Sequence, residues 1–173
     1  MNKGRNIIIL VIIVGGVIAS LFMVGGADVA KWNDKVIAIH KRYGMDWKGF
    51  EASIVPWLQG KALDAEKAEA AYRTYTVKVG QTAAEIKREL PPKDKLCQEF
   101  HGLLVQYGDL QQSQLTDLRK LLDEMKAANP GSEADRTRVA SAIDALGAKE
   151  TALQNAVQAK QKEMAAKFKL QLK

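Results

Sequence analysis

Cys97 and His101 are the two residues whose types and spacing come nearest to a chemical site. They stand four positions apart, which places a thiol and an imidazole on the same face of a helix. A zinc site needs three or four such ligands, and Glu99 falls on a different face. The chain has no second cysteine, and its other histidine is the distant His40. We therefore interpret the pair as a thiol beside a surface histidine and expect no bound metal.

Reaction machinery is otherwise missing from the sequence. It contains no GxxxxGK[ST] phosphate loop, no GxGxxG dinucleotide motif, no HExxH zinc motif and no CxxC pair. The Glu-x-x-His spacing of di-iron bundles is absent as well. Only 6% of the residues are aromatic, which is few for a large core around an enclosed pocket. These absences predict a protein that is not an enzyme and carries no cofactor.

The C-terminal end of the chain is basic. From residue 160 onward Glu163 is the only acid, against five lysines: Lys160, Lys162, Lys167, Lys169 and Lys173. Such a cluster could attract an anionic lipid or an acidic partner. It could equally be a solvated helix end whose lysines suit the negative end of the helix dipole. Nucleic acid is not an expected partner, because the cluster contains no arginine for base recognition.

An uncharged apolar stretch precedes all other predicted elements. Residues 7–27 contain no charged side chain, and a helix of roughly 20 such residues crosses the ~30 Å hydrocarbon layer of a membrane. A cleaved signal peptide is the alternative, but its apolar region usually runs only about 7–15 residues. We predict residues 1–27 to be a tail and a single-pass anchor in a bacterial inner membrane. Lys3 and Arg5 favour a cytoplasmic N-terminus and hence a periplasmic C-terminal domain, whereas the basic residues after the span argue for the reverse orientation: Lys31, Lys35, Lys41 and Arg42.

Small residues recur four positions apart within this stretch. Gly15, Gly16, Ala19 and Ser20 form two overlapping small-xxx-small pairs, a spacing that lets transmembrane helices approach closely. We expect them to pack against another membrane protein or a second copy of this chain. The alternative is that they are ordinary members of an apolar span.

Residues 28–60 form a Trp-rich juxtamembrane segment. It is predicted as a helix to residue 43, a turn at Gly44, and a short second helix that Pro56 disrupts. Tryptophan and tyrosine favour the interface between membrane and water. We therefore expect contact with the membrane or a partner protein, with plain core packing as the alternative, for Trp32, Tyr43, Trp47, Phe50 and Trp57.

Residues 61–173 are predicted as a bundle of long helices. The first spans 64–90, with Asp64 as its N-cap. The second and third, 93–128 and 132–172, are joined by a short turn and form an antiparallel coiled-coil hairpin. Ser132 and Asp135 resemble a capping box at the start of the third. Apolar residues spaced by three or four form the hairpin seam: Leu96, Phe100, Leu103, Tyr107, Leu110, Leu118, Leu121, Met125, Val139, Ile143, Leu146, Leu153 and Val157.

Polar residues interrupt this seam. Gln114 is its polar member in the second helix, and Glu150 and Lys160 interrupt it in the third. The two charged residues could pair with residues of the neighbouring helix, or they could mark where the third helix leaves the bundle. The sequence favours the second interpretation, because apolar residues become sparse towards the C-terminus.

The predicted architecture is all-α, with an N-terminal transmembrane helix, a short juxtamembrane helix and a long-helix bundle. This order resembles the architecture of LemA-type membrane proteins. The chain lacks the motifs that follow the span in that family. The leading hypothesis is a membrane-anchored structural or interaction subunit, a scaffold that presents its bundle to partners in an envelope assembly. The alternative is an extracytoplasmic module that binds a small ligand or a lipid between its helices.

Overall fold

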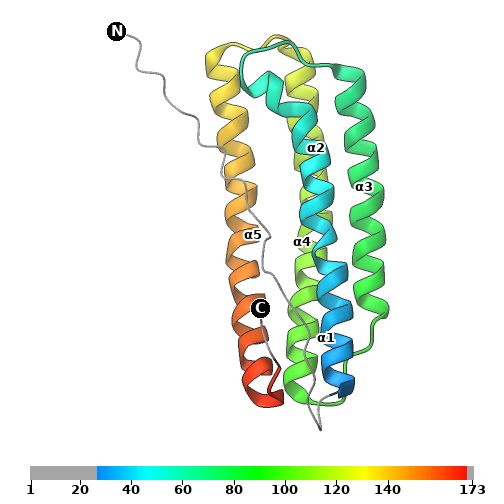
Figure 1. The fold of residues 1–173 in the computed structure, drawn as a ribbon. Helices are drawn as coiled ribbons and strands as arrows, with labels where there is room; N and C mark the ends of the chain where they lie inside the picture. Colours follow the sequence, from blue (N-terminus) through cyan, green and yellow to red (C-terminus); the bar gives the residue numbers. More distant parts are fainter. Residues whose placement is uncertain (1–26, 171–173) are drawn as a thin grey trace.

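The chain is all-α over residues 27–170, the part that the structure, a computed structural model, describes (Figure 1). The predicted fold class is confirmed for this part of the chain. Its helices are α1 (Ala27–His40), α2 (Arg42–Leu58), α3 (Ala65–Arg88), α4 (Lys95–Ala127) and α5 (Glu133–Phe168).

The helices pack as a four-helix bundle in which α1 and α2 together form one rod (Figure 1). This rod packs beside α3, α3 packs against α4, and α5 returns alongside α4. Consecutive rods run antiparallel, as short connections require. The fourth side of the bundle, between α5 and the α1–α2 rod, has the least contact of the four.

Side-chain caps begin the three long helices. Asp64 Oδ1 accepts a hydrogen bond from a first-turn N–H of α3 (3.0 Å), and Asp94 Oδ1 does the same for α4 (2.9 Å). Ser132 and Asp135 form a complete capping box at the start of α5. The predicted caps at Asp64 and Ser132 are confirmed, because capping depends on local chemistry that a sequence displays directly.

The break in the first rod lies at Lys41 rather than at Gly44. Gly44 is inside α2, so the predicted turn was placed wrongly, whereas Pro56 lies close to the end of α2, where the disruption was predicted. Packing of the apolar face of α2 on α3 holds the helix through the glycine, whose intrinsic cost is only about 1 kcal/mol. Pro56 is tolerated because α2 ends two residues later, at Leu58.

The Trp-rich segment is core, which corrects the expected contact with a membrane or partner. Four of its five aromatic residues are at most 8% exposed: Trp32, Tyr43, Phe50 and Trp57. Trp47 is half-buried and packs edge-on against Tyr75 of α3, with 5.8 Å between ring centroids. The rings follow a helical stripe, and this stripe faces α3 and α4.

The predicted hairpin is present as α4 and α5, and all of its predicted seam residues are at least half-buried. The core also contains Cys97, Leu104 and Leu122, which the seam does not include. The reason is that α4 is flanked by both α3 and α5, so it buries a wider face than a two-stranded coiled coil needs.

α5 remains in the bundle to its end. Met164 is fully buried, and Lys160 Nζ pairs with Glu99 of α4 (3.1 Å) and with Glu163 (2.7 Å). The interpretation that Glu150 and Lys160 mark a departure of this helix from the bundle is therefore wrong. Lys160 instead pairs with a residue of the neighbouring helix, which was the alternative interpretation.

The predicted anchor requires a correction. Residues 7–26 of the span, including Gly15, Gly16, Ala19 and Ser20, lie outside the described residues. Within residues 27–170, none of the helices combines the length and the apolar character needed to cross a membrane. This finding contradicts the predicted localisation as a single-pass protein of a bacterial inner membrane with a periplasmic domain, and we withdraw that localisation.

Candidate functional site

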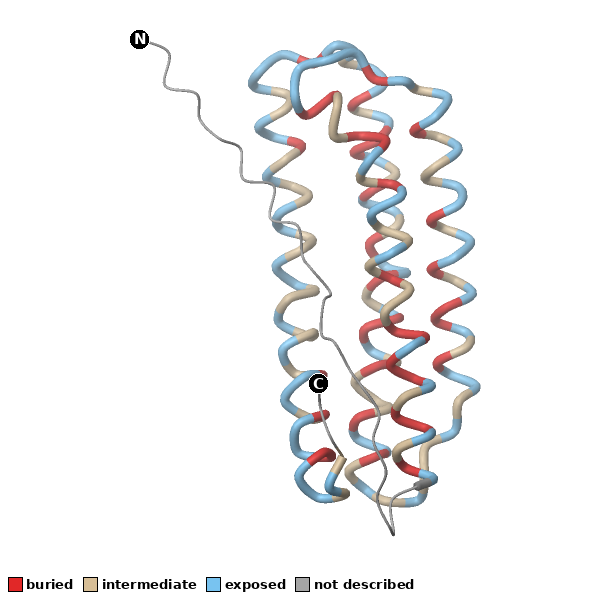
Figure 2. The backbone as a smooth tube through the Cα atoms, in the orientation of Figure 1, coloured by how far each residue is buried: buried red, intermediate tan, exposed pale blue. Residues whose placement is uncertain are grey.

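The middle of α5 packs loosely against the α1–α2 rod. No residue of α5 between Val139 and Val157 is buried, whereas both ends of the helix bury side chains (Figure 2). The sequence explains this, because the stretch is rich in alanine and contains Gly147. Gly44 of α2 likewise carries no side chain that could fill the space.

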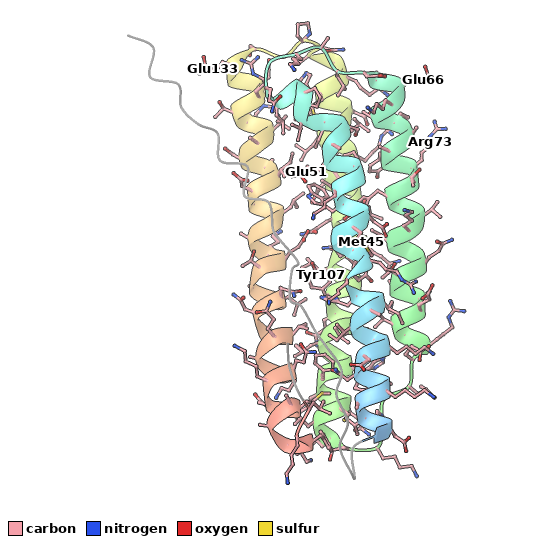
Figure 3. All side chains as sticks on the ribbon, viewed as in Figure 1. Met45, Glu51, Glu66, Arg73, Tyr107 and Glu133 are labelled. Atoms are coloured by element: carbon pink, nitrogen blue, oxygen red, sulfur yellow. The ribbon has the colours of Figure 1, made fainter. Side chains whose placement is uncertain are left out.

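A cavity of about 130 Å³ lies in this space. α2, α4 and α5 all contribute to its walls, and Figure 3 shows Glu51 and Tyr107 between the α2 and α5 ribbons. Gly44 and Gly147 line it, so the absence of two side chains helps to create it. Its other lining residues include Tyr43, Trp47, Glu51, Tyr107, Gln111, Gln114, Asp144 and Glu150.

Aromatic rings from α2 and α4 form part of the wall. The ring centroids of Tyr43 and Tyr107 are 5.5 Å apart, and Trp47 lines the same cavity. Behind them, His40 meets the Tyr107 ring edge-on at 4.6 Å. Burial raises the pKa of both tyrosines, so these residues act as neutral hydroxyl groups at neutral pH.

Two buried polar groups of the lining have no hydrogen-bond partner among the described residues. Gln111 is 3% exposed; its Oε1 accepts from the Tyr75 hydroxyl (2.8 Å), and its Nε2 meets no acceptor at full hydrogen-bond geometry, although the amide lies close enough to Glu150 to lower the pKa of that carboxyl. The Tyr43 hydroxyl is also unpaired and faces Gly108, where an added Cβ would lie 2.8 Å from it. A buried donor without an acceptor costs about 1–3 kcal/mol, so such groups point to a missing partner.

Glu150 of α5 brings a carboxyl group to the cavity. The Tyr107 hydroxyl donates to its Oε2 at 3.4 Å. Burial raises the pKa of Glu150, and the nearby Gln111 amide and Tyr107 hydroxyl oppose that shift. Burial also raises the pKa of Glu51 on α2, which Lys48 partly opposes. Neither carboxylate has an ion-pair partner among the described residues.

His40 continues the polar contacts between the first rod and α5. Its Nε2 lies 2.9 Å from Oε1 of Gln154, and its Nδ1 has no partner within the described residues. Burial lowers the pKa of His40, and the Gln154 contact opposes the shift. Farther along, Gln161 of α5 donates to Asn33 of α1 (3.4 Å). This side of the bundle is therefore joined by amides and a neutral imidazole.

The other candidates from the sequence do not form a site. Cys97 is fully buried, and burial raises the pKa of its thiol. His101 Nε2 lies 2.8 Å from the carbonyl oxygen of Ile86 instead of facing a metal. No group of three potential metal ligands occurs within residues 27–170.

The basic end is partly neutralised by neighbouring acids. Lys167 pairs with Asp94 (2.5 Å), in addition to the pairs of Lys160 already described. Lys162 and Lys169 are exposed, and Lys173 lies outside the described residues. An anionic lipid or acidic partner at this end stays a prediction.

The sequence singles out some of the cavity residues, but it does not show that they lie together. Gln114 and Glu150 stood out as polar members of an apolar seam, and that irregularity was the available signal. Gln114 Nε2 donates to the carbonyl of Leu146 (3.0 Å), so it joins α4 to α5 at the cavity. Gln111 and Glu51 were missed, because they lie off the predicted hairpin seam: Gln111 bonds to Tyr75 of α3, and Glu51 belongs to α2.

Comparisons with protein-family models, with curated proteins and with solved structures gave no match for this chain. The architectural resemblance to LemA-type proteins gains no support from them. The function must therefore be inferred from the geometry of the cavity.

Proposed function

We propose that this protein is a small-molecule-binding helical bundle whose site is the cavity between α2, α4 and α5. The observation that carries the proposal is the cavity itself, a space of about 130 Å³ lined by aromatic and polar side chains of three helices. A core packed for stability alone fills such a space with apolar side chains. A ligand of matching size would fill this space and contact its polar lining.

The size of the cavity limits the ligand. An engineered apolar cavity of about 150 Å³ binds benzene, and drug-sized pockets measure about 300–1,000 Å³. A cavity of about 130 Å³ therefore suits a compound with roughly one ring. A lipid chain is too large, so the small-ligand form of the alternative hypothesis is favoured over the lipid form.

The test is a thermal-shift screen of the full chain against a library of small metabolites. A ligand that binds the folded state raises the melting temperature, because unfolding must release it. We expect hits whose effect is lost in Gly147→Leu, which fills the cavity from α5. This variant should fold, because leucine is a better helix former than glycine by nearly 1 kcal/mol.

Gly80→Leu is the matched control. Gly80 is also a helical glycine, but it lies on α3 with open space around the position of an added Cβ. Hits should bind this variant as they bind the unmodified chain. A screen without hits, or hits that bind Gly147→Leu with unchanged affinity, would contradict the proposed function.

The interaction-subunit hypothesis stays a prediction. It requires partner proteins, so its test is whether the full chain co-purifies with other proteins at fixed stoichiometry. The withdrawn localisation forms no part of it.

A further inference from the structure

The charged residues that line the cavity are all acids. They are Glu51 from α2 and Asp144 and Glu150 from α5, and among the described lining residues none is a lysine, arginine or histidine. Charges of one sign in a partly buried site create a potential that favours a ligand of the opposite sign. An anionic ligand would face repulsion from these three carboxylates, and no lining residue is a base that could compensate for it.

The rest of the wall suits the body of an organic cation. The faces of tryptophan and tyrosine attract ammonium groups within about 6 Å of the ring centroid, and aromatic cages recognise such cations in proteins. Trp47, Tyr43 and Tyr107 bring three such rings to the lining. Leu118, Ile143 and Ala148 add apolar contacts, which an inorganic cation would not use.

We propose that the cavity binds a small organic ammonium ion, with Glu150 as its counter-ion and the rings of Trp47, Tyr43 and Tyr107 around its apolar part. The proposal rests on the small-molecule function and names the ligand class. Glu150 is the central group, because it is half-buried, has no ion-pair partner in the described part of the chain and lies beside Tyr107.

Three probes of nearly equal shape and different charge test this proposal. Benzylamine, a cation at pH 7.5, is compared with neutral benzyl alcohol and anionic benzoate by ligand-observed NMR titration of the full chain. We expect benzylamine to bind at least about tenfold more tightly than benzyl alcohol, which corresponds to one charge-assisted hydrogen bond. Benzoate should bind more weakly than benzyl alcohol.

Two variants assign the preference to Glu150. Glu150→Gln keeps the shape of the side chain, and we expect it to abolish the tenfold preference while benzyl alcohol binds as before. Glu133→Gln is the control, because Glu133 is an exposed acid of the same helix, 17 residues away, or about 25 Å at 1.5 Å per residue. It should leave all three affinities unchanged. Circular dichroism of both variants checks that the helices are intact.

The outcomes separate the two proposals. If benzyl alcohol or benzoate binds as tightly as benzylamine, or if Glu150→Gln retains the preference, the ammonium proposal is overturned and the cavity remains a small-molecule site. If none of the probes binds, the ammonium proposal is also overturned, and the binding function depends on the library screen with Gly147→Leu. The ammonium proposal is likewise overturned if that screen finds an anion that binds in the cavity.

Discussion

At the residue scale, the proposed counter-ion Glu150 carries a cost in stability. Its carboxyl group lies half-buried beside Tyr107 and Gln111, and no base pairs with it among residues 27–170. Burial disfavours the charged form and raises its pKa in the folded state. The folded chain therefore holds this proton more tightly than the unfolded chain does. The stability of the folded chain should therefore fall as the pH rises from about 4.3, the usual pKa of glutamate, through the raised pKa of Glu150 in the folded state.

The first prediction concerns the removal of this charge. Glu150→Gln should raise the free energy of unfolding at pH 7 by about 1 kcal/mol, because an uncharged amide costs less to bury. For a domain of this size that corresponds to a melting temperature higher by roughly 2–4 °C. Thermal denaturation followed by circular dichroism measures the effect.

The pH dependence is the control for this prediction. Below pH 4 Glu150 is protonated in both states, so the gain should disappear there. A gain of equal size at pH 3.5 and pH 7 would contradict the electrostatic explanation. Stabilisation by loss of a buried carboxylate would also support a functional role, since groups kept for binding often reduce stability.

At the element scale, the connection between α4 and α5 packs against the end of α2. An added Cβ at Gly131 would lie 2.3 Å from Cζ2 of Trp57, a fully buried ring. Gly131→Ala should therefore lower the free energy of unfolding by about 1–3 kcal/mol, the usual cost of overpacking. Urea denaturation checks this value. Gly49→Ala is the control, because nothing lies within 4 Å of its Cβ position and α2 should gain up to about 1 kcal/mol.

The two helices of the hairpin should differ in local stability. α4 buries eleven of its 33 residues, whereas α5 buries five of its 36. Hydrogen exchange reports local opening, which is easier where few apolar contacts must break. Amides of residues 141–155 in α5 should therefore exchange at least about tenfold faster than those of residues 104–118 in α4. Equal protection of the two segments, measured by exchange with mass spectrometry, would contradict the loose packing described here.

Some features of the fold could be predicted from the sequence, and others could not. Caps such as Asp64 and Ser132 are local, so they were predicted correctly, and the hairpin followed from its short connection. Gly44 misled the prediction because tertiary packing outweighs the modest loss of helix propensity at a glycine. The cavity could not be predicted, because it forms where α2 meets α5, about a hundred residues apart in the chain.

At the scale of the whole molecule, α5 is joined to the bundle mainly through α4. Its contacts with the first rod include two polar pairs, His40 with Gln154 and Asn33 with Gln161. A ligand in the cavity would touch both α2 and α5. It would therefore add contacts between α5 and the first rod, the side of the bundle where the helices have the fewest. Binding should thus be visible as slower hydrogen exchange in residues 141–155, as well as a higher melting temperature.

The core described here draws on residues from Val29 to Ala165. A fragment of residues 27–173 therefore contains the side chains of this core and all the caps at Asp64, Asp94 and Ser132. We expect the fragment to fold and to unfold in a single cooperative transition, as single domains of this length usually do. Circular dichroism and intrinsic tryptophan fluorescence should give coincident unfolding curves, because the three tryptophans report on the same core as the helices. Curves that separate, or a fragment without a cooperative transition, would mean that the bundle depends on residues 1–26.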